Sequence, residues 1–144
     1  MIVSTSLWGI VLATALGALV GAEREWRRHP GGLRSCALVS GAAAAYGRIA
    51  VDYGGTGTGA ALGAVATGVG FLGAGVIMRH AGHVRGLSTA ATFWAVAAIG
   101  VASGLLAYDL ALVLTLLVFF AHVALRPLSA WIERKAPPED RGPR

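Results

Sequence analysis

Residues 53–78 read YGGTGTGAALGAVATGVGFLGAGVIM, a run of 26 residues without Asp, Glu, Lys or Arg. A helix needs about 20 apolar residues to cross the hydrocarbon core of a bilayer. Only helices and closed barrels satisfy every backbone polar group there. Two similar runs cover residues 1–22 and 86–108, and shorter ones cover 35–47 and 110–125. The sequence therefore predicts an integral membrane protein.

The composition supports this prediction. The 144 residues are 56% hydrophobic and 13% charged, whereas soluble domains carry about 25% charged residues. We expect an all-α, polytopic bundle of about five transmembrane helices, at residues 6–22, 33–50, 58–78, 88–106 and 110–125. Residues 1–126 would form one membrane domain. Residues 127–144 would form a short, charged, proline-containing tail, which we expect to be disordered.

Basic residues are segregated to alternate connections. The segments 23–34, 79–87 and 126–144 share one side of a five-helix bundle and hold eleven of the twelve Lys and Arg residues. Cytoplasmic segments of membrane proteins are enriched in Lys and Arg. The sequence thus predicts an outward N-terminus and a cytoplasmic C-terminus.

The segment 68–73, GVGFLG, matches the glycine pattern of a dinucleotide-binding loop. Such a loop needs a preceding strand and an acidic residue about 20 positions later, but no carboxylate follows before Asp109. Small residues instead let transmembrane helices approach closely. We therefore expect helix packing, within the chain and also between copies in a homo-oligomer, at Gly17, Gly21, Gly59, Gly63, Gly70, Gly73, Gly75, Gly100 and Gly104.

The chemistry of catalysis is missing from the sequence. The single cysteine, the scattered histidines and the separated carboxylates form no nucleophile–base pair and no metal-ligand cluster at a recognisable spacing. We expect no enzyme activity, no cofactor, no metal site and no nucleic-acid binding. One feature supports an alternative function as a channel or transporter. The glycines at 68, 70, 73 and 75 can break a helix and expose backbone carbonyls to a pore.

Polar residues concentrate in the connections 23–34 and 79–87. Glu23 and Arg27 are four residues apart and can pair along a helix, and Ser88 or Thr89 can cap the helix that follows. Three interpretations stay open: ordinary cytoplasmic charges with internal pairing, a surface for a protein partner or lipid headgroups, and a small-anion site. The candidate contact residues are Glu23, Arg24, Arg27, Arg34, Arg79, Arg85, Ser88 and Thr89.

Two stretches carry a family resemblance. GAEREWRRHPGGLRSCALV (21–39) and GVGFLGAGVIMRHAGHVRGLSTAATFWA (68–95) resemble the two motif regions of the MgtC/SapB family of bacterial inner-membrane proteins. The positions that match the family motifs are Glu23, Arg24, Gly32, Leu33, Arg34, Gly70, Phe71, Gly73, Gly75, Arg85, Gly86, Leu87, Thr89, Ala90 and Ala91.

The resemblance implies a role in coping with low magnesium and in stress adaptation. It also implies a partner, since the best-known member is regarded as a regulator of the membrane sector of the F-type ATP synthase. Many relatives carry a soluble ACT-like domain after the membrane region, whereas this sequence ends after a short tail. We expect a non-catalytic regulator or adaptor that contacts membrane lipids and a membrane protein. The alternative is a small oligomeric Mg²⁺ channel or transporter.

Overall fold

The computed structural model describes residues 2–80 and 83–135 of the chain. In these residues five α-helices, one short 3₁₀ helix and two short strands follow one another. Their bounds are α1 Ile2–Trp26, α2 Leu33–Tyr53, η1 Gly55–Gly57, α3 Thr58–Val76, β1 Met78–His80, β2 His83–Arg85, α4 Leu87–Gly104 and α5 Tyr108–Lys135. The all-α bundle predicted from the sequence is confirmed.

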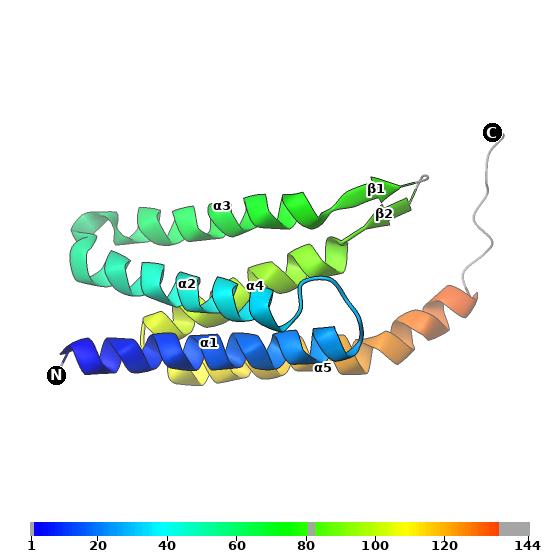
Figure 1. Cartoon of the computed structure of the whole chain (residues 1–144), viewed down its shortest axis with the longest axis horizontal. Coiled ribbons are helices and arrows are strands. Elements are labelled where there is room, and N and C mark those ends of the chain that lie inside the picture. Colours follow the sequence, from blue (N-terminus) through cyan, green and yellow to red (C-terminus); the bar gives the residue numbers. More distant parts are fainter. Residues whose placement is uncertain (1, 81–82, 136–144) are drawn as a thin grey trace.

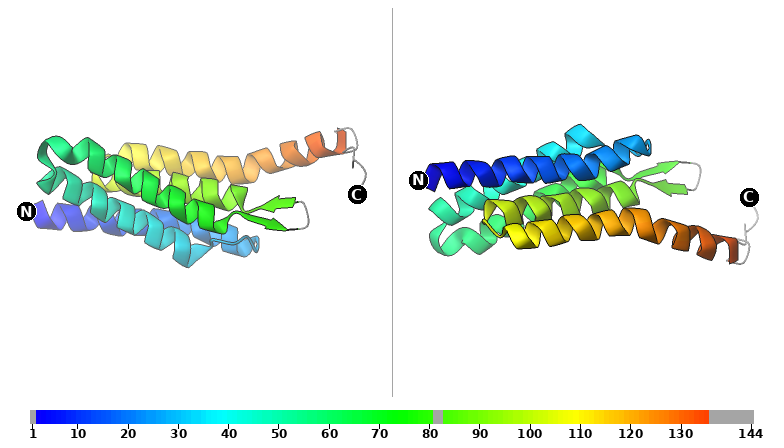
Figure 2. Two further views of the ribbon diagram at one scale, coloured as in Figure 1. Left: turned by 90° about the horizontal axis from the view of Figure 1, so that it is seen from above. Right: turned by 90° about the horizontal axis from the view of Figure 1, so that it is seen from below.

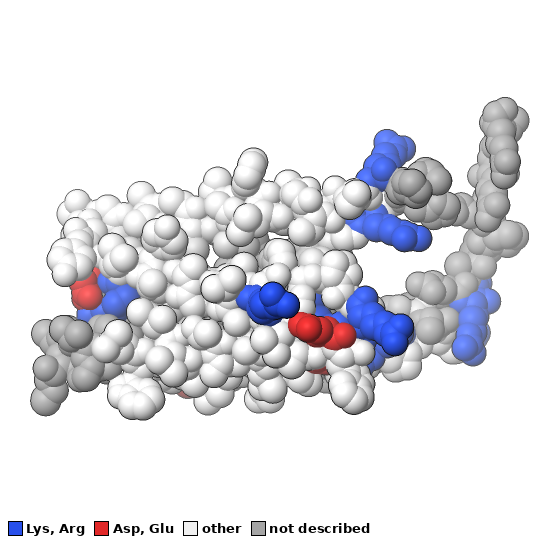
Figure 3. Space-filling model, viewed as in Figure 1, with Lys and Arg blue, Asp and Glu red and all other residues white. Residues whose placement is uncertain are grey.

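The helices run up and down along one long axis (Figures 1 and 2). α1, α3 and α5 end, and α2 and α4 begin, at the end from which the β1–β2 hairpin projects. We call this the basic end, since Arg24 near the end of α1, Arg34 near the start of α2, and Arg79 and Arg85 of the hairpin all belong to it. In Figure 3 charged side chains lie at one end of the bundle and from the middle of the view towards the basic end, while the surface over α3 is uncharged.

Four of the helices are long and apolar enough to cross a membrane, over Leu7–Trp26, Gly55–Val76, Leu87–Gly104 and Tyr108–Ser129. α2 does not meet this criterion, although the sequence analysis predicts a span at 33–50. Its Arg34, Arg48 and Asp52 lower its hydropathy. Nevertheless α2 runs the length of the bundle beside α1 and α4, which cover its small face.

The core lies where α1, α2 and α4 meet. Ten of the eighteen residues of α4 are buried, among them Val96, Ile99 and Gly100. On α2, buried residues recur every three or four positions from Cys36 to Ala50, which is the period of one helix face. α3 contrasts with both, because only Val69 and Gly73 are buried among its nineteen residues.

The boundaries of α1 and α5 differ from the prediction. α1 continues past residue 22 to Trp26, and α5 continues past residue 125 to Lys135. Hydropathy marks where a helix leaves the hydrocarbon, not where its hydrogen bonding ends. The tail predicted to be disordered from residue 127 is therefore helical as far as Lys135, and residues 136–144 lie outside the described residues. α5 bends in its C-terminal part, where Pro127 removes a backbone donor (Figure 2).

The connection between α3 and α4 is a hairpin rather than an irregular loop. β1 and β2 are antiparallel, with Met78 opposite Arg85 and Arg79 opposite Val84. Gly86 then has a φ of +91° and precedes the first residue of α4. A side chain there would collide with the carbonyl of Val76, so the turn requires glycine. The predicted capping of α4 by Ser88 or Thr89 is wrong: Gly86 is the N-cap, without a side-chain hydrogen bond.

Candidate functional site at the basic end

Arg24 is the centre of the polar network at the basic end. Its side chain is only 1% exposed, although it carries a charge. It follows Ala13, Gly17 and Val20 at helical spacing, so it lies on the packed face of α1. The sequence predicts Arg24 to be a surface contact residue, but in the structure it lies inside the bundle.

Four hydrogen bonds surround the Arg24 guanidinium. Nη1 donates to Thr92 Oγ1 at 2.9 Å, and Nη2 donates to Thr89 Oγ1 at 2.8 Å. Nη2 and Nε also donate to the carbonyls of Pro30 and Gly31, at 2.8 and 3.2 Å. The planar guanidinium suits such a fixed set of acceptors better than a lysine would. Arg24 therefore ties α1, the 27–32 connection and the first turns of α4 together.

Thr92 extends this network to α5. Its hydroxyl lies 3.1 Å from His122 Nε2, and its Oγ1 also donates to the Ser88 carbonyl at 2.8 Å. The other ring nitrogen of His122, Nδ1, lies 3.3 Å from Glu23 Oε2. His122 of α5 thus has partners on two other helices, α1 and α4.

Glu23 forms the ion pair with Arg27 that the four-residue spacing predicts. The next carboxylate, Glu25, has a different role, because its Oε2 accepts a hydrogen bond from the Leu33 amide at 2.9 Å. This bond satisfies one of the free donors at the start of α2. The acidic residues of the 23–34 segment are thus engaged within the chain.

A polar cleft of about 220 Å³ lies beside this network, between the ends of α1 and α5 and the start of α4. Arg27, His29 and Arg126 bring basic groups to it, and Glu23 brings a carboxylate. Within residues 2–80 and 83–135, no three His, Cys, Asp or Glu side chains gather as a metal site would need. The cleft offers mixed charge and hydrogen-bonding groups.

All but one of the remaining candidate contact residues are exposed. Arg34, Arg79, Arg85 and Ser88 are exposed, whereas Thr89 is 2% exposed and bonded to Arg24. Arg79 and Arg85 occupy the two strands of the hairpin, and Arg34 is the second residue of α2. The eight predicted contact residues therefore separate into an internal network and an exposed set. We call Arg34, Arg79 and Arg85 the free arginines, since none forms an ion pair with another described residue.

The packing glycines separate in the same way. An added Cβ would lie 2.6 Å from the Cys36 carbonyl at Gly17, and 2.6 Å from Leu33 Cα at Gly21. At Gly100 and Gly104 it would collide with the carbonyls of Ser40 and Ala44. At Gly73 it would lie 3.3 Å from Ala90 Cβ. In contrast, no atom of the described chain lies within 4 Å of a Cβ added at Gly59, Gly63, Gly70 or Gly75.

Comparison with known proteins identifies related sequences. The model of the MgtC family matches residues 10–131. Protein MgtC of Salmonella paratyphi A is 40% identical over 144 residues, which cover 94% of this chain and 62% of the relative. Protein MgtC of Salmonella typhimurium is 42% identical over 126 residues, 88% of this chain and 54% of the relative. Protein MgtC of Brucella abortus is 38% identical over 125 residues, 86% of this chain and 52% of the relative.

The chain thus spans between about half and three fifths of the length of these relatives. No solved structure matches it. The family match and the four apolar helices together establish a multi-pass membrane protein.

Proposed function

Since this chain belongs to the MgtC family, we propose that it is a non-catalytic regulator or adaptor in the bacterial inner membrane. It would act under magnesium limitation or related stress by binding a membrane protein partner. The observation that carries this proposal is the exposure of the three free arginines, Arg34, Arg79 and Arg85, at one end of the bundle. By the positive-inside rule this end faces the cytoplasm, and the N-terminus faces outward.

The open surface of α3 gives such a partner a place to pack. Gly59, Gly63 and Gly70 fall on one face of α3 at helical spacing, and no atom of the described residues lies within 4 Å of a Cβ added there. Transmembrane helices associate where small residues allow their backbones to approach. A helix of the partner, or of a second copy in a homo-oligomer, would pack on this face. Arg79 and Arg85 would then lie beside the partner's cytoplasmic surface.

The alternative function, a small oligomeric cation channel or transporter, would use the glycines of residues 68–75 as a pore element. This segment is continuous α-helix rather than a broken one. The cavities beside it are lined by apolar residues such as Val69, Ala74 and Trp94. Intramembrane ion paths are usually marked by polar or ionisable side chains. These observations favour the adaptor.

A pull-down from native membranes in mild detergent tests the proposal. Wild type is compared with Arg85→Ala, which removes an exposed hairpin arginine, and with Arg28→Ala as the matched exposed control. We expect wild type and Arg28→Ala to retain a defined membrane complex that Arg85→Ala loses. The family resemblance makes the membrane sector of the F-type ATP synthase the first candidate to look for. Recovery of nothing but copies of the chain in all three samples would count against a partner. Mg²⁺ flux into proteoliposomes would then support the channel instead.

A further inference from the structure

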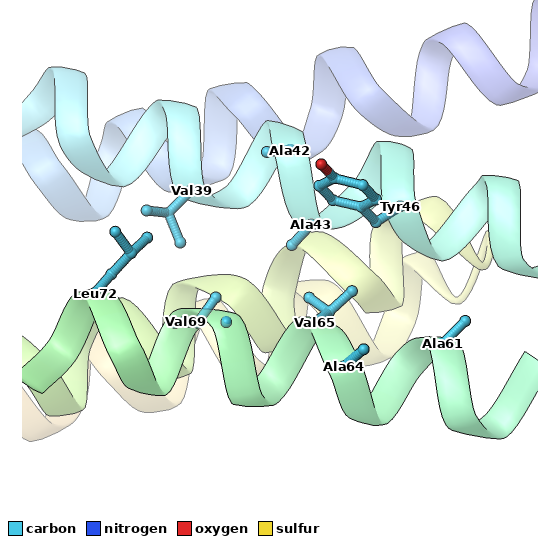
Figure 4. A pocket seen from close by; sticks show the side chains of 10 residues that line it. Val39, Ala42, Ala43, Tyr46, Ala61, Ala64, Val65, Val69 and Leu72 are labelled. Atoms are coloured by element: carbon cyan, nitrogen blue, oxygen red, sulfur yellow. The ribbon is translucent and has the colours of Figure 1, made fainter.

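Two cavities of the bundle differ in chemistry. A groove of about 530 Å³ between α2 and α3 is lined by uncharged residues such as Val39 and Leu72 (Figure 4). The polar cleft at the basic end has a smaller volume, about 220 Å³, but Arg24, Arg27 and Arg126 all line it. The cleft therefore has charged groups that can select a ligand, whereas the lining of the groove has none.

Arg24 is a buried cation whose hydrogen bonds all go to neutral groups. The acceptors are the hydroxyls of Thr89 and Thr92 and the carbonyls of Pro30 and Gly31. None of the ion pairs among residues 2–80 and 83–135 includes Arg24. A guanidinium has five N–H donors, so these four bonds leave one donor on Nη1 for a further acceptor. A buried charge is costly unless it is paired, and an anion in the cleft would supply the missing charge.

The cleft as a whole has an excess of positive charge. Three arginines line it, and among the described residues Glu23 brings the one carboxylate. Glu23 pairs with Arg27 and contacts Nδ1 of His122 at 3.3 Å. Arg24 and Arg126 thus have no anionic partner in the part of the chain that the structure describes. Three arginines against one carboxylate leave two positive charges unbalanced, even with the histidines of the cleft neutral.

The cleft lies at the level of the lipid headgroups. The apolar spans of α1 and α5 end at Trp26 and Ser129, and residues from the last turns of both spans line the cleft. The headgroup region of a bilayer begins where such spans end. Arg126 and Ser129 are exposed, so the cleft is accessible from outside the bundle. A phosphate can reach it from a lipid headgroup or from the adjacent water.

We propose that the polar cleft binds one phosphate group through Arg24, Arg27 and Arg126. A phosphate monoester carries about −1.5 to −2 charges at pH 7 and three acceptor oxygens, which matches the excess of positive charge. Guanidinium groups suit phosphate oxygens because their N–H groups form a planar fork. Inorganic phosphate and a lipid such as phosphatidic acid both present such a group. The site is distinct from the free arginines, and it does not depend on the proposed function.

Two probes test the site and separate the two sources of phosphate. The full chain in mild detergent is titrated with inorganic phosphate by equilibrium dialysis. Native mass spectrometry then counts retained phosphatidic acid or phosphatidylcholine with identical acyl chains. Saturable binding of inorganic phosphate supports a soluble source, and retention of phosphatidic acid over phosphatidylcholine without phosphate binding supports a lipid source. Binding of neither probe, or equal retention of the two lipids without phosphate binding, would overturn the proposal.

A pair of arginine variants on α5 tests the location. Arg126→Gln removes a cleft arginine, whereas Arg134→Gln removes the same charge from an exposed position that does not line the cleft. We expect Arg126→Gln to bind the probe that wild type binds about tenfold more weakly, equivalent to about 1.4 kcal/mol. Arg134→Gln should bind it as wild type does. Unchanged binding by Arg126→Gln, or equal losses in both variants, would place the phosphate elsewhere and overturn the proposal.

A second pair of variants tests the cleft without changing any charge. Ser129→Phe fills the cleft from an exposed position, and Ser129→Ala removes the same hydroxyl but leaves the space open. We expect Ser129→Phe to lose the bound probe and Ser129→Ala to retain it. Circular dichroism and a single elution peak verify that each variant is folded, and the arginine pair decides the question if Ser129→Phe fails this check. Full binding by folded Ser129→Phe would equally overturn the proposal.

The part of Arg24 is read from NMR of the wild-type chain labelled with ¹⁵N-arginine. The bound probe should shift the assigned Nε signal of Arg24 and leave that of Arg134 in place. A shift of the Arg126 signal without one at Arg24 would show that the ligand does not meet the buried charge, against the proposal.

Discussion

α3 contains six glycines, of which only Gly73 is buried, whereas both glycines of α4 are buried against another helix. Gly100 and Gly104 face the backbone of α2 at Ser40 and Ala44. At the other five glycines of α3, a Cβ would contact no atom in the part of the chain that the structure describes. A high glycine content therefore does not by itself identify a packing face.

The difference lies in what each helix meets. α2 presents Ser40, Ala43 and Ala44, which are as small as the glycines opposite, so two backbones can come together. Within residues 2–80 and 83–135, no such small face covers Gly59, Gly63 or Gly70. We therefore distinguish a packed half, formed by α1, α2 and α4, from an open half, formed by α3 and the β1–β2 hairpin. The packed half stabilises the fold, and the open half is available to lipids and other chains.

The largest effect is expected from replacing one arginine in the packed half and, separately, one in the open half with methionine. Arg24→Met leaves two threonine hydroxyls and two carbonyls without their common donor. Each buried acceptor left without its donor costs about 1–3 kcal/mol, so the loss of all four bonds should cost at least about 3 kcal/mol. The free energy of unfolding should fall by that amount in an SDS titration in mixed micelles.

Arg79→Met is the matched control for this prediction. Arg79 is exposed on β1, and exposed substitutions usually change stability by less than about 0.5 kcal/mol. Equal losses for the two variants would show that the hairpin is as important to the fold as the internal network, and the division into halves would be wrong.

A smaller effect is expected from adding one methyl group to α4 or to α3 by replacing a glycine with alanine. In Gly100→Ala the new Cβ meets the Ser40 carbonyl, and it lies 2.9 Å from Ala43 Cβ. Overpacking of this kind costs about 1–3 kcal/mol. In Gly63→Ala the methyl group meets no atom of the described residues, and alanine is more favourable than glycine in a helix by about 1 kcal/mol.

SDS titrations of the two alanine variants should therefore shift in opposite directions, with Gly100→Ala less stable and Gly63→Ala at least as stable as wild type. A loss of stability in Gly63→Ala that grows with protein dilution would instead reveal a contact between copies on the open half.

These contrasts also show which features the sequence could predict. Charge-free runs of about 20 residues identify the membrane helices, because the bilayer requires that length whatever the helices pack against. The stripe that includes Gly17 and Gly21 identifies a packing face of α1. Its partner could not be deduced, since Cys36 and Leu33 belong to another helix.

The site was less accessible to sequence reasoning than the fold. Arg24 lies next to Glu23 and Glu25 in a charged segment, which favours an exposed position. Its partners Thr89 and Thr92 are 65 and 68 residues away. One signal was present, because Arg24 continues the Ala13–Gly17–Val20 face of α1 at helical spacing. No such signal indicated that the glycine face of α3 is exposed, since glycines that pack and glycines that face lipid look alike in one sequence.

The smallest effect is expected from replacing one threonine in each half with valine. Thr92→Val keeps the shape of the side chain but removes the hydroxyl between Arg24 and His122, so we expect a loss of about 1 kcal/mol. Thr67→Val on α3 removes only a bond to the Gly63 carbonyl within the same helix, and its free energy of unfolding should not change measurably.

The distinction is sharpened by a double-mutant cycle of Thr92→Val with His122→Phe. Coupling between the two should be evident, because both belong to one chain of contacts from α1 through α4 to α5. Additive losses would mean that Thr92 holds Arg24 alone and that α5 is attached independently of the network.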